Sequence, residues 1–131
     1  MLWPVVAGLD EGLGYTGCSA GISSLGEVAP DSSRRDFSDE IWQPGLRLFP
    51  GVTFGPHWDM LDTYLPGLRS IISEAIPDDQ TLFAVDERTA AVGNGSTWSV
   101  IGLGKVHVRR AGEWQAWGAG ETFTAPLLEP A

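Results

Sequence analysis

The pentapeptide Gly17-Cys18-Ser19-Ala20-Gly21 follows the pattern G-x-S-x-G, with a serine at its centre. Where such a pentapeptide joins a strand to a helix, the glycines permit a sharp turn that exposes the serine hydroxyl. The backbone N–H groups that follow can stabilise an oxyanion. The pattern therefore favours Ser19 as a nucleophile, although a tight structural turn would have the same residues. We expect Cys18 to be buried and inert, because Ser19 is the central residue.

A serine nucleophile needs a nearby base, and the chain has two histidines. His57 lies between an expected strand and an expected helix, and the end of a strand is where α/β enzymes place catalytic loop residues. His107 alternates with Val106 and Val108, so we expect it on the solvent face of a strand. His57 is therefore the candidate base, with a purely structural histidine as the alternative.

The third member of such a site is a carboxylate that orients the imidazole. The pair Asp86 and Glu87 follows an apolar run at another expected strand end. Asp59 and Asp62 lie close to His57 in the sequence. On the residues alone, the choice among these four acids stays open.

Aromatic and basic residues near these segments are candidates for substrate binding. Trp42 and Trp58 lie in the loops beside the proposed site, with core packing as the alternative. Arg34, Arg35 and Arg47 could hold a substrate carboxylate through paired hydrogen bonds. They could equally balance nearby acids on the surface.

The first half of the chain is predicted to carry the serine and the histidine on short elements. Flanking glycines predict a short buried strand at Tyr15–Cys18 and a helix over Ser19–Val28. Residues 29–45 are polar and read as a surface loop. Residues 60–76 have apolar residues at helical spacing, with a kink or a new start at Pro66.

From Thr81 onward the chain reads as a β-meander. Short runs of strand-forming residues are separated by turn residues such as Gly93-Asn94-Gly95. Five strands are expected, at Thr81–Val85, Thr89–Val92, Thr97–Ile101, Val106–Arg109 and Glu113–Trp117. Residues 118–131 look like a tail. This order of elements indicates an α/β or α+β fold in a single domain, residues 1–131.

Length and charge narrow the class of protein. The 131 residues fit one domain, and 17 acidic against 8 basic residues give a net charge of −9. This charge argues against nucleic acid and anionic membranes as partners. One cysteine allows no internal disulfide and no zinc site built from several cysteines. Because no targeting signal, P-loop, dinucleotide fingerprint or H-E-x-x-H motif is visible, we expect a cytoplasmic protein with neither a cofactor nor a metal.

Four blocks of residues occur in a familiar order. They are Gly17–Gly21, Gly55–Asp59, Val85–Ala90 and Val100–Val106. With these blocks the chain resembles the cyanophycinase and aspartyl dipeptidase (dipeptidase E) family of serine peptidases, within the class I glutamine amidotransferase-like superfamily. Members of that family have a G-x-S-A-G pentapeptide, a P-H-x-D-like segment and a D-E-x-T-A segment. The resemblance covers about residues 12–110.

This resemblance implies a flavodoxin-like α/β sandwich that hydrolyses peptide or amide bonds, with a small peptide or amide as substrate. By position, Ser19 would be the nucleophile and His57 the general base. Ala20 would supply one oxyanion N–H. For the acid, the resemblance favours Glu87 over Asp86.

The resemblance is to the C-terminal half of the family's domain. Members have a longer N-terminal part, which supplies central parallel strands and a glycine-bearing loop of the oxyanion hole. Without those strands the expected strand at Tyr15–Cys18 would be unpaired, so we expect a homodimer or a complementing N-terminal fragment. The alternative function is therefore a catalytically incomplete fragment or an interaction module of the same fold. A subunit that supplies ammonia to a partner is a third possibility, against which the serine argues.

Overall fold

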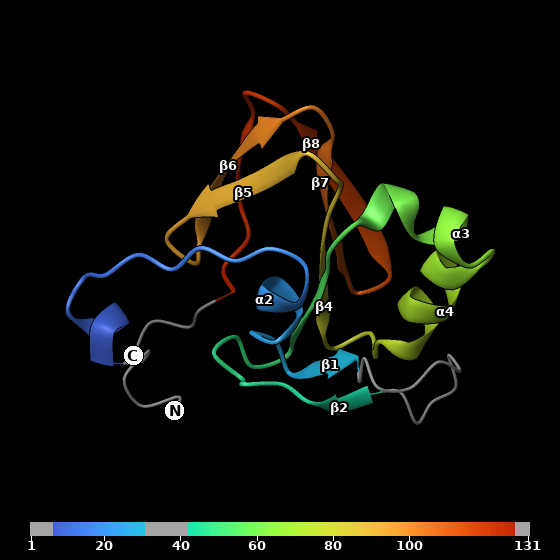
Figure 1. The fold of residues 1–131 in the computed structure, drawn as a ribbon, viewed down its shortest axis with the longest axis horizontal. Coiled ribbons are helices and arrows are strands. Elements are labelled where there is room, and N and C mark those ends of the chain that lie inside the picture. Colours follow the sequence, from blue (N-terminus) through green and yellow to red (C-terminus); the bar gives the residue numbers. More distant parts are fainter. Residues whose placement is uncertain (1–6, 31–41, 128–131) are drawn as a thin grey trace.

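The computed structural model describes residues 7–30 and 42–127. Over these ranges the chain forms a mixed α/β fold with three β-sheets and a few short helices (Figure 1). None of the helices within these ranges is long and apolar enough to cross a membrane.

The central sheet has four strands. Their order is β3 (Val52–Gly55), β4 (Thr81–Val85), β7 (Lys105–Arg110) and β8 (Glu113–Gly118). β3 and β4 are parallel, and the other neighbours are antiparallel. All of β4 is buried, because successive side chains of a strand point to opposite faces and both faces are covered. Phe83 and Val85 contribute to the main core, whereas Leu82 and Ala84 belong to a second, smaller core.

A three-stranded sheet packs against one face of the central sheet. It contains β5 (Thr89–Gly93), β6 (Thr97–Gly102) and β9 (Thr122–Thr124), in that order. Aromatic rings fill the space between the two sheets: the ring of Phe83 lies 5.1 Å from that of Trp98 and 6.1 Å from that of Phe123. Burying these rings is a main source of stability for the fold.

The segment before β3 lies along the outer side of that strand. It contains α2 (Ala20–Ser23), β1 (Val28–Pro30) and β2 (Trp42–Pro44), with β1 and β2 paired as a small antiparallel sheet. The Glu27 N–H donates to the Val52 carbonyl oxygen at 2.7 Å, which ties this segment to β3. In Figure 1, α2 lies in the middle of the molecule, above β1.

Short helices cover the other face of the central sheet. They are η2 (Trp58–Met60), α3 (Leu61–Tyr64) and α4 (Leu68–Ala75), and the second core lies between them and β4. The helix predicted over residues 60–76 is interrupted near Pro66, as expected, because proline has no N–H to donate. The next residue, Gly67, has a φ of +84°, which starts α4 in a new direction.

Three expected elements differ from the structure. Tyr15–Cys18 forms no strand and is exposed, since no strand in the described part of the chain lies beside it to accept its backbone hydrogen bonds. The helix expected over Ser19–Val28 is only the four residues of α2. Turns and bends follow it, and Val28 begins β1. Within the tail expected over residues 118–131, β9 pairs with β6 and buries Phe123, so that part is core.

The flavodoxin-like sandwich is not confirmed. Among the strands that the structure describes, β3 and β4 are the one parallel pair, whereas a doubly wound sheet is mostly parallel. The expected surface loop over residues 29–45 lies partly outside the described residues, and its ends form β1 and β2. The β-meander expected after Thr81 is wrong, because these strands divide between two sheets: β4 pairs with β7, whereas β5 and β6 lie in the sheet with β9.

Candidate active site

Ser19 lies at the turn that leads into α2. Its backbone has φ 52° and ψ −117°, a conformation that favours glycine and is costly for a residue with a side chain. The preceding Gly17 permits this turn, because a Cβ there would lie 2.7 Å from the Gly21 carbonyl oxygen. The side chain of Ser19 is thus presented by a strained, tightly packed turn of the kind that a nucleophile elbow uses.

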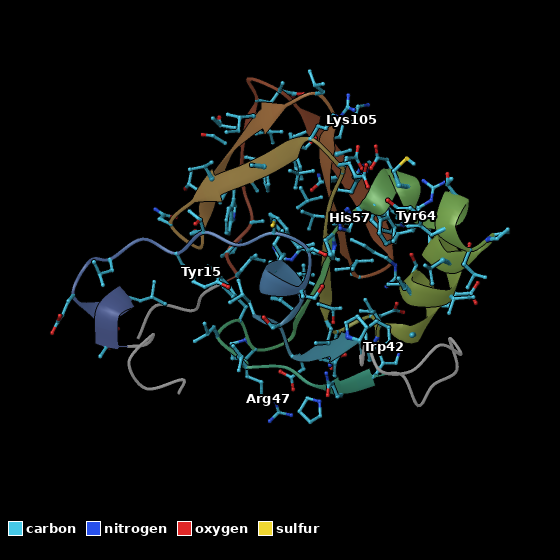
Figure 2. All side chains as sticks on the ribbon, in the orientation of Figure 1. Tyr15, Trp42, Arg47, His57, Tyr64 and Lys105 are labelled. Carbon is cyan, nitrogen blue, oxygen red and sulfur yellow. The ribbon has the colours of Figure 1, made fainter. Side chains whose placement is uncertain are left out.

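The same turn is held from outside by an aromatic side chain. The Tyr15 hydroxyl donates to the Gly21 carbonyl oxygen at 2.7 Å, and the Ser23 hydroxyl donates to the Ser19 carbonyl oxygen at 3.3 Å. Figure 2 shows Tyr15 beside α2. Cys18 is exposed, so the expectation that it is buried is wrong. Residues 9–20 around it are all exposed, so this segment lies on the surface.

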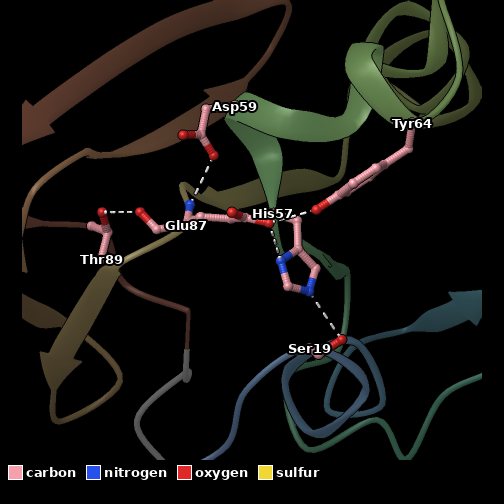
Figure 3. A network of polar contacts seen from close by, with 6 residues as sticks. All are labelled: Ser19, His57, Asp59, Tyr64, Glu87 and Thr89. Carbon is pink, nitrogen blue, oxygen red and sulfur yellow. Dashed lines mark hydrogen bonds and ion pairs between the residues drawn. The ribbon is translucent and has the colours of Figure 1, made fainter.

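His57 follows β3 and begins η2. Its φ of +55° and ψ of 32° turn the chain sharply, so the ring points back toward α2. The imidazole Nε2 lies 3.1 Å from the Ser19 hydroxyl oxygen (Figure 3). At this distance a proton can pass between the two groups.

Glu87 follows β4 and approaches the other side of the imidazole. Its Oε1 lies 3.1 Å from His57 Nδ1. A neutral imidazole with its proton on Nδ1 donates to Glu87, and Nε2 can then accept from the Ser19 hydroxyl. The structure therefore brings Ser19, His57 and Glu87 together, although they are far apart in the sequence.

Two further side chains hold Glu87. The Asp59 Oδ1 accepts the Glu87 N–H at 2.8 Å, and the Tyr64 hydroxyl donates to Glu87 Oε1 at 2.6 Å. The hydrogen bond to the Glu87 carboxylate is the main reason why the pKa of Tyr64 is raised above its ordinary value of 10.0. Thr89 adds a third contact, since its hydroxyl donates to the Glu87 carbonyl oxygen at 3.0 Å.

The other candidate acids have different partners. The Asp86 carboxylate accepts the Lys105 N–H at 2.9 Å and lies 3.0 Å from His107 Nε2. The expectation that His107 faces solvent is therefore wrong, because its ring is half-buried against Asp86. Asp62 pairs with Arg69, whose Nε lies 2.9 Å away. Of the four acids considered from the sequence, the Glu87 carboxylate is the one that contacts His57.

The residues predicted to bind substrate lie in different surroundings. Trp58 is only 5% exposed, because its ring packs in the second core and against Trp114. Its remaining surface borders a groove of about 490 Å³ between α4 and β8. Arg47 forms an ion pair with Glu27 at 3.1 Å and lies far from His57 in Figure 2. Trp42 is half-buried on β2, while Arg34 and Arg35 lie outside the described residues.

Sequence reasoning missed Tyr64 and the contact that Asp59 makes. Both follow His57 closely, and η2 and α3 turn the chain so that both side chains return to Glu87. The available signal was the closeness of Asp59 to His57 in the sequence, which identified Asp59 only as a possible acid. Tyr64 carried no comparable signal, because its place depends on where α3 packs.

Comparisons with known proteins include a similarity to a solved peptidase structure. No family model matches the chain. No curated protein matches it. A search of solved structures finds the crystal structure of a peptidase from an acI-B1 Actinobacterium, with a TM-score of 0.66 and 29% sequence identity. The alignment covers 83% of this chain and 44% of that peptidase, so the chain spans less than half of its length and is similar to it in fold.

Proposed function

We propose that this chain carries the catalytic site of a serine-type hydrolase that cleaves peptide or amide bonds. One observation carries the proposal: the Ser19 hydroxyl, the His57 imidazole and the Glu87 carboxylate form a continuous series with two 3.1 Å contacts. A nucleophile, a base and an orienting acid in this order are what acyl transfer requires. The similarity in fold to a peptidase supports peptide bonds as the substrate.

In the first half of the proposed reaction, the Ser19 oxygen attacks the substrate carbonyl carbon. His57 Nε2 accepts the hydroxyl proton as the new C–O bond forms. His57 then donates this proton to the leaving amine as the C–N bond breaks, which leaves the acyl group on Ser19. Glu87 keeps the ring in the required orientation and stabilises the imidazolium while it carries the extra proton.

In the second half, water replaces the amine. His57 accepts a proton from the water as its oxygen attacks the acyl carbon, and the proton returns to Ser19 when the ester bond breaks. In both halves a negative oxygen develops on the substrate. The Ala20 N–H is the proposed donor to this oxygen, because Ala20 is the first residue of α2 and its amide has no partner within that helix.

The backbone of Ser19 supports the choice of nucleophile. A serine with φ 52° and ψ −117° persists only where its surroundings enforce it, and such conformations cluster at functional sites. A purely structural turn would be better served by glycine at this position. The strain is therefore more readily explained by a need for the hydroxyl.

Finer assignments extend this proposal. We assign the chain to the cyanophycinase and dipeptidase E family on its four sequence blocks, with a flavodoxin-like domain completed by a partner or a further segment. A small peptide or amide is the proposed substrate, and the cytoplasm is the proposed location. Because the alignment covers 44% of the similar peptidase, the activity of a whole peptidase is part of this proposal.

A fluorophosphonate probe tests the nucleophile directly, because it reacts with activated serines. We expect the full chain to be labelled at Ser19, with the site identified by mass spectrometry. Ser19→Ala should lower labelling by at least about 10³-fold, since removing the nucleophile removes the covalent step. The matched control is Ser24→Ala, which changes a half-buried serine of the same segment and should be labelled normally. Labelling that persists in Ser19→Ala would refute the assignment.

A further inference from the structure

The hydroxyl of Tyr64 and the imidazole of His57 converge on one oxygen atom. Tyr64 donates to Glu87 Oε1 at 2.6 Å, and His57 Nδ1 lies 3.1 Å from the same Oε1. Figure 3 shows the two side chains reaching Glu87 from different sides. A carboxylate oxygen can accept two such hydrogen bonds, so the contacts do not compete.

The contact is notable because Tyr64 gains little from burial. The residue is 60% exposed, and its ring lies across from the His57 ring at 6.4 Å between centroids, in an edge-on arrangement. Core packing therefore does not explain its position. What fixes the ring is the bond from its hydroxyl to the acid.

Glu87 needs such a contact because contacts that fix its backbone do not fix its carboxylate. Asp59 and Thr89 hold the main chain of Glu87 on both sides of the residue. The side chain is long and partly exposed, with several rotatable bonds beyond the point where the backbone is fixed. Tyr64 is the described side chain, other than His57, that contacts the carboxylate itself.

We propose that Tyr64 is a positioning residue for the hydrolytic site: its hydroxyl fixes the Glu87 carboxylate so that Oε1 stays against His57 Nδ1. This inference rests on the proposed function. Tyr64 acts through Glu87 and makes no contact with the nucleophile among the described interactions.

The titration of Tyr64 gives this role a distinct signature. The charged groups that face its hydroxyl are Glu87 and Asp59, and the His57 ring lies near the Tyr64 ring at 80° to it. The Glu87 hydrogen bond raises the pKa of Tyr64 most, followed by desolvation and by the negative charges of Glu87 and Asp59. Tyr64 therefore keeps its proton to a higher pH than an ordinary tyrosine, and its loss of the proton would place a second negative charge against Glu87.

The first experiment compares the rate of fluorophosphonate labelling at Ser19 in the wild type and in Tyr64→Phe. The variant removes one hydroxyl from an exposed ring, so the fold should be retained. We expect labelling to be about fivefold slower in the variant. We also expect the wild type to lose rate at alkaline pH as Tyr64 ionises, and the variant to lack this decline. The matched control, Asp62→Asn, breaks another polar contact of α3 and should leave the rate unchanged.

The second experiment needs no activity. The chain has two tyrosines, so in a Tyr15→Phe background the tyrosinate absorbance reports on Tyr64 alone. We expect Glu87→Gln in this background to lower the pKa of Tyr64 toward its ordinary value, because a neutral amide replaces the charged acceptor. The same titration curve with and without Glu87→Gln would mean that the bond does not form.

The outcomes separate the two proposals. If wild-type Ser19 is not labelled, the proposed function fails and the positioning role fails with it. If Ser19 is labelled normally but Tyr64→Phe reacts at the wild-type rate with an unchanged pH profile, only the role of Tyr64 is overturned. A slower rate together with loss of the alkaline decline supports it.

Discussion

The segment that carries Ser19 and the segment that carries Glu87 are held in different ways. Residues 11–20 are exposed throughout, and α2 has only four residues. In contrast, β4, which leads into Glu87, is buried along its full length between two cores. The proposed acid is thus positioned by the main fold, whereas the proposed nucleophile is positioned by local contacts around one turn.

Because of this difference, stability and reactivity can be changed separately in this molecule. The turn at Ser19 depends on the close approach of Gly17 to Gly21 and on the hydroxyl of Tyr15. The position of His57 and Glu87 depends on β3 and β4, whose side chains fill the cores. A substitution in the cores should therefore change mainly the free energy of unfolding. A substitution around Ser19 should change mainly its labelling.

The largest effect is expected from the core. Phe83→Ala removes a ring that is 2% exposed and packs on Trp98, Phe123 and Phe54. The cavity should lower the free energy of unfolding by about 3–5 kcal/mol, measured by denaturant titration with tryptophan fluorescence. Where the variant is still folded, labelling at Ser19 should persist. A destabilisation below about 1 kcal/mol would show that the two sheets do not share a packed core.

The next effect is local to the nucleophile. In Gly17→Ala the added Cβ would lie 2.7 Å from the Gly21 carbonyl oxygen, so the turn must shift. A displacement of this size should slow labelling at Ser19 by about 100-fold, while the unfolding midpoint changes little. Gly14→Ala is the control, because a Cβ there meets no atom within 4 Å. Equal labelling rates for the two variants would contradict the described turn.

A smaller effect should reveal the strain at Ser19. Ser19→Gly and Ser19→Ala both lack the hydroxyl, but only glycine adopts φ 52° and ψ −117° without strain. We expect the relief of backbone strain to outweigh the extra conformational entropy that glycine has in the unfolded chain. We expect Ser19→Gly to be the more stable of the two by about 1 kcal/mol in thermal or denaturant unfolding. Equal stability of the two variants would mean that the backbone of Ser19 is not strained.

The smallest effect concerns the link between α3 and α4. Hydrogen bonds from the Arg69 backbone and side chain lower the pKa of Asp62 below its ordinary value of 3.8. A lowered pKa in the folded state means that the charged form stabilises the fold above pH 3.8 and that this contribution is lost as the pH falls below it. Asp62→Asn should thus be slightly less stable than the wild type at neutral pH. The difference between their denaturant midpoints should vanish in acid. A difference that grows in acid would mean that the pKa of Asp62 is not lowered in the folded state.

The strands after Thr81 are predictable because each signal is local. The apolar run Thr81–Val85 has the length of a strand buried on both faces, and its predicted bounds match β4. Turn residues such as Gly93-Asn94-Gly95 separate the following strands. In contrast, β9 has three residues, and only its pairing with β6 makes Phe123 part of the core. Such a strand has no signal of its own.

The strand expected at Tyr15–Cys18 fails for a related reason. A strand requires a neighbour for its backbone groups, and the sequence of a segment does not state whether one is present. The expectation of a homodimer or a complementing fragment also rested on an unpaired strand at Tyr15–Cys18. Because that strand does not form, this reason for association no longer applies, and association stays a proposal. The outer side of β3 is instead covered by the segment that follows α2, through the bond from Glu27 to Val52.

Within the site, residue types were predictable and supporting contacts were not. The pentapeptide and the position of His57 at a strand end suggested Ser19 and His57, and the structure brings both to Glu87. Their catalytic roles stay predictions. The orientation of Tyr64 and the burial of Trp58 depend on how η2 and α3 pack on the sheet, which no spacing of residues expresses.

The parallel pairing of β3 with β4 has a consequence for the order in which the protein folds. Antiparallel strands β7 and β8 join through a tight turn, whereas β3 and β4 must first bring together residues separated by the whole α3 and α4 crossover. Local pairings form faster than distant ones. We expect the hairpins β5–β6 and β7–β8 to form early, His57 to reach Glu87 when β3 docks, and Ser19 to arrive last. During refolding, the tryptophan fluorescence should then reach its native value before Ser19 reacts with a serine probe.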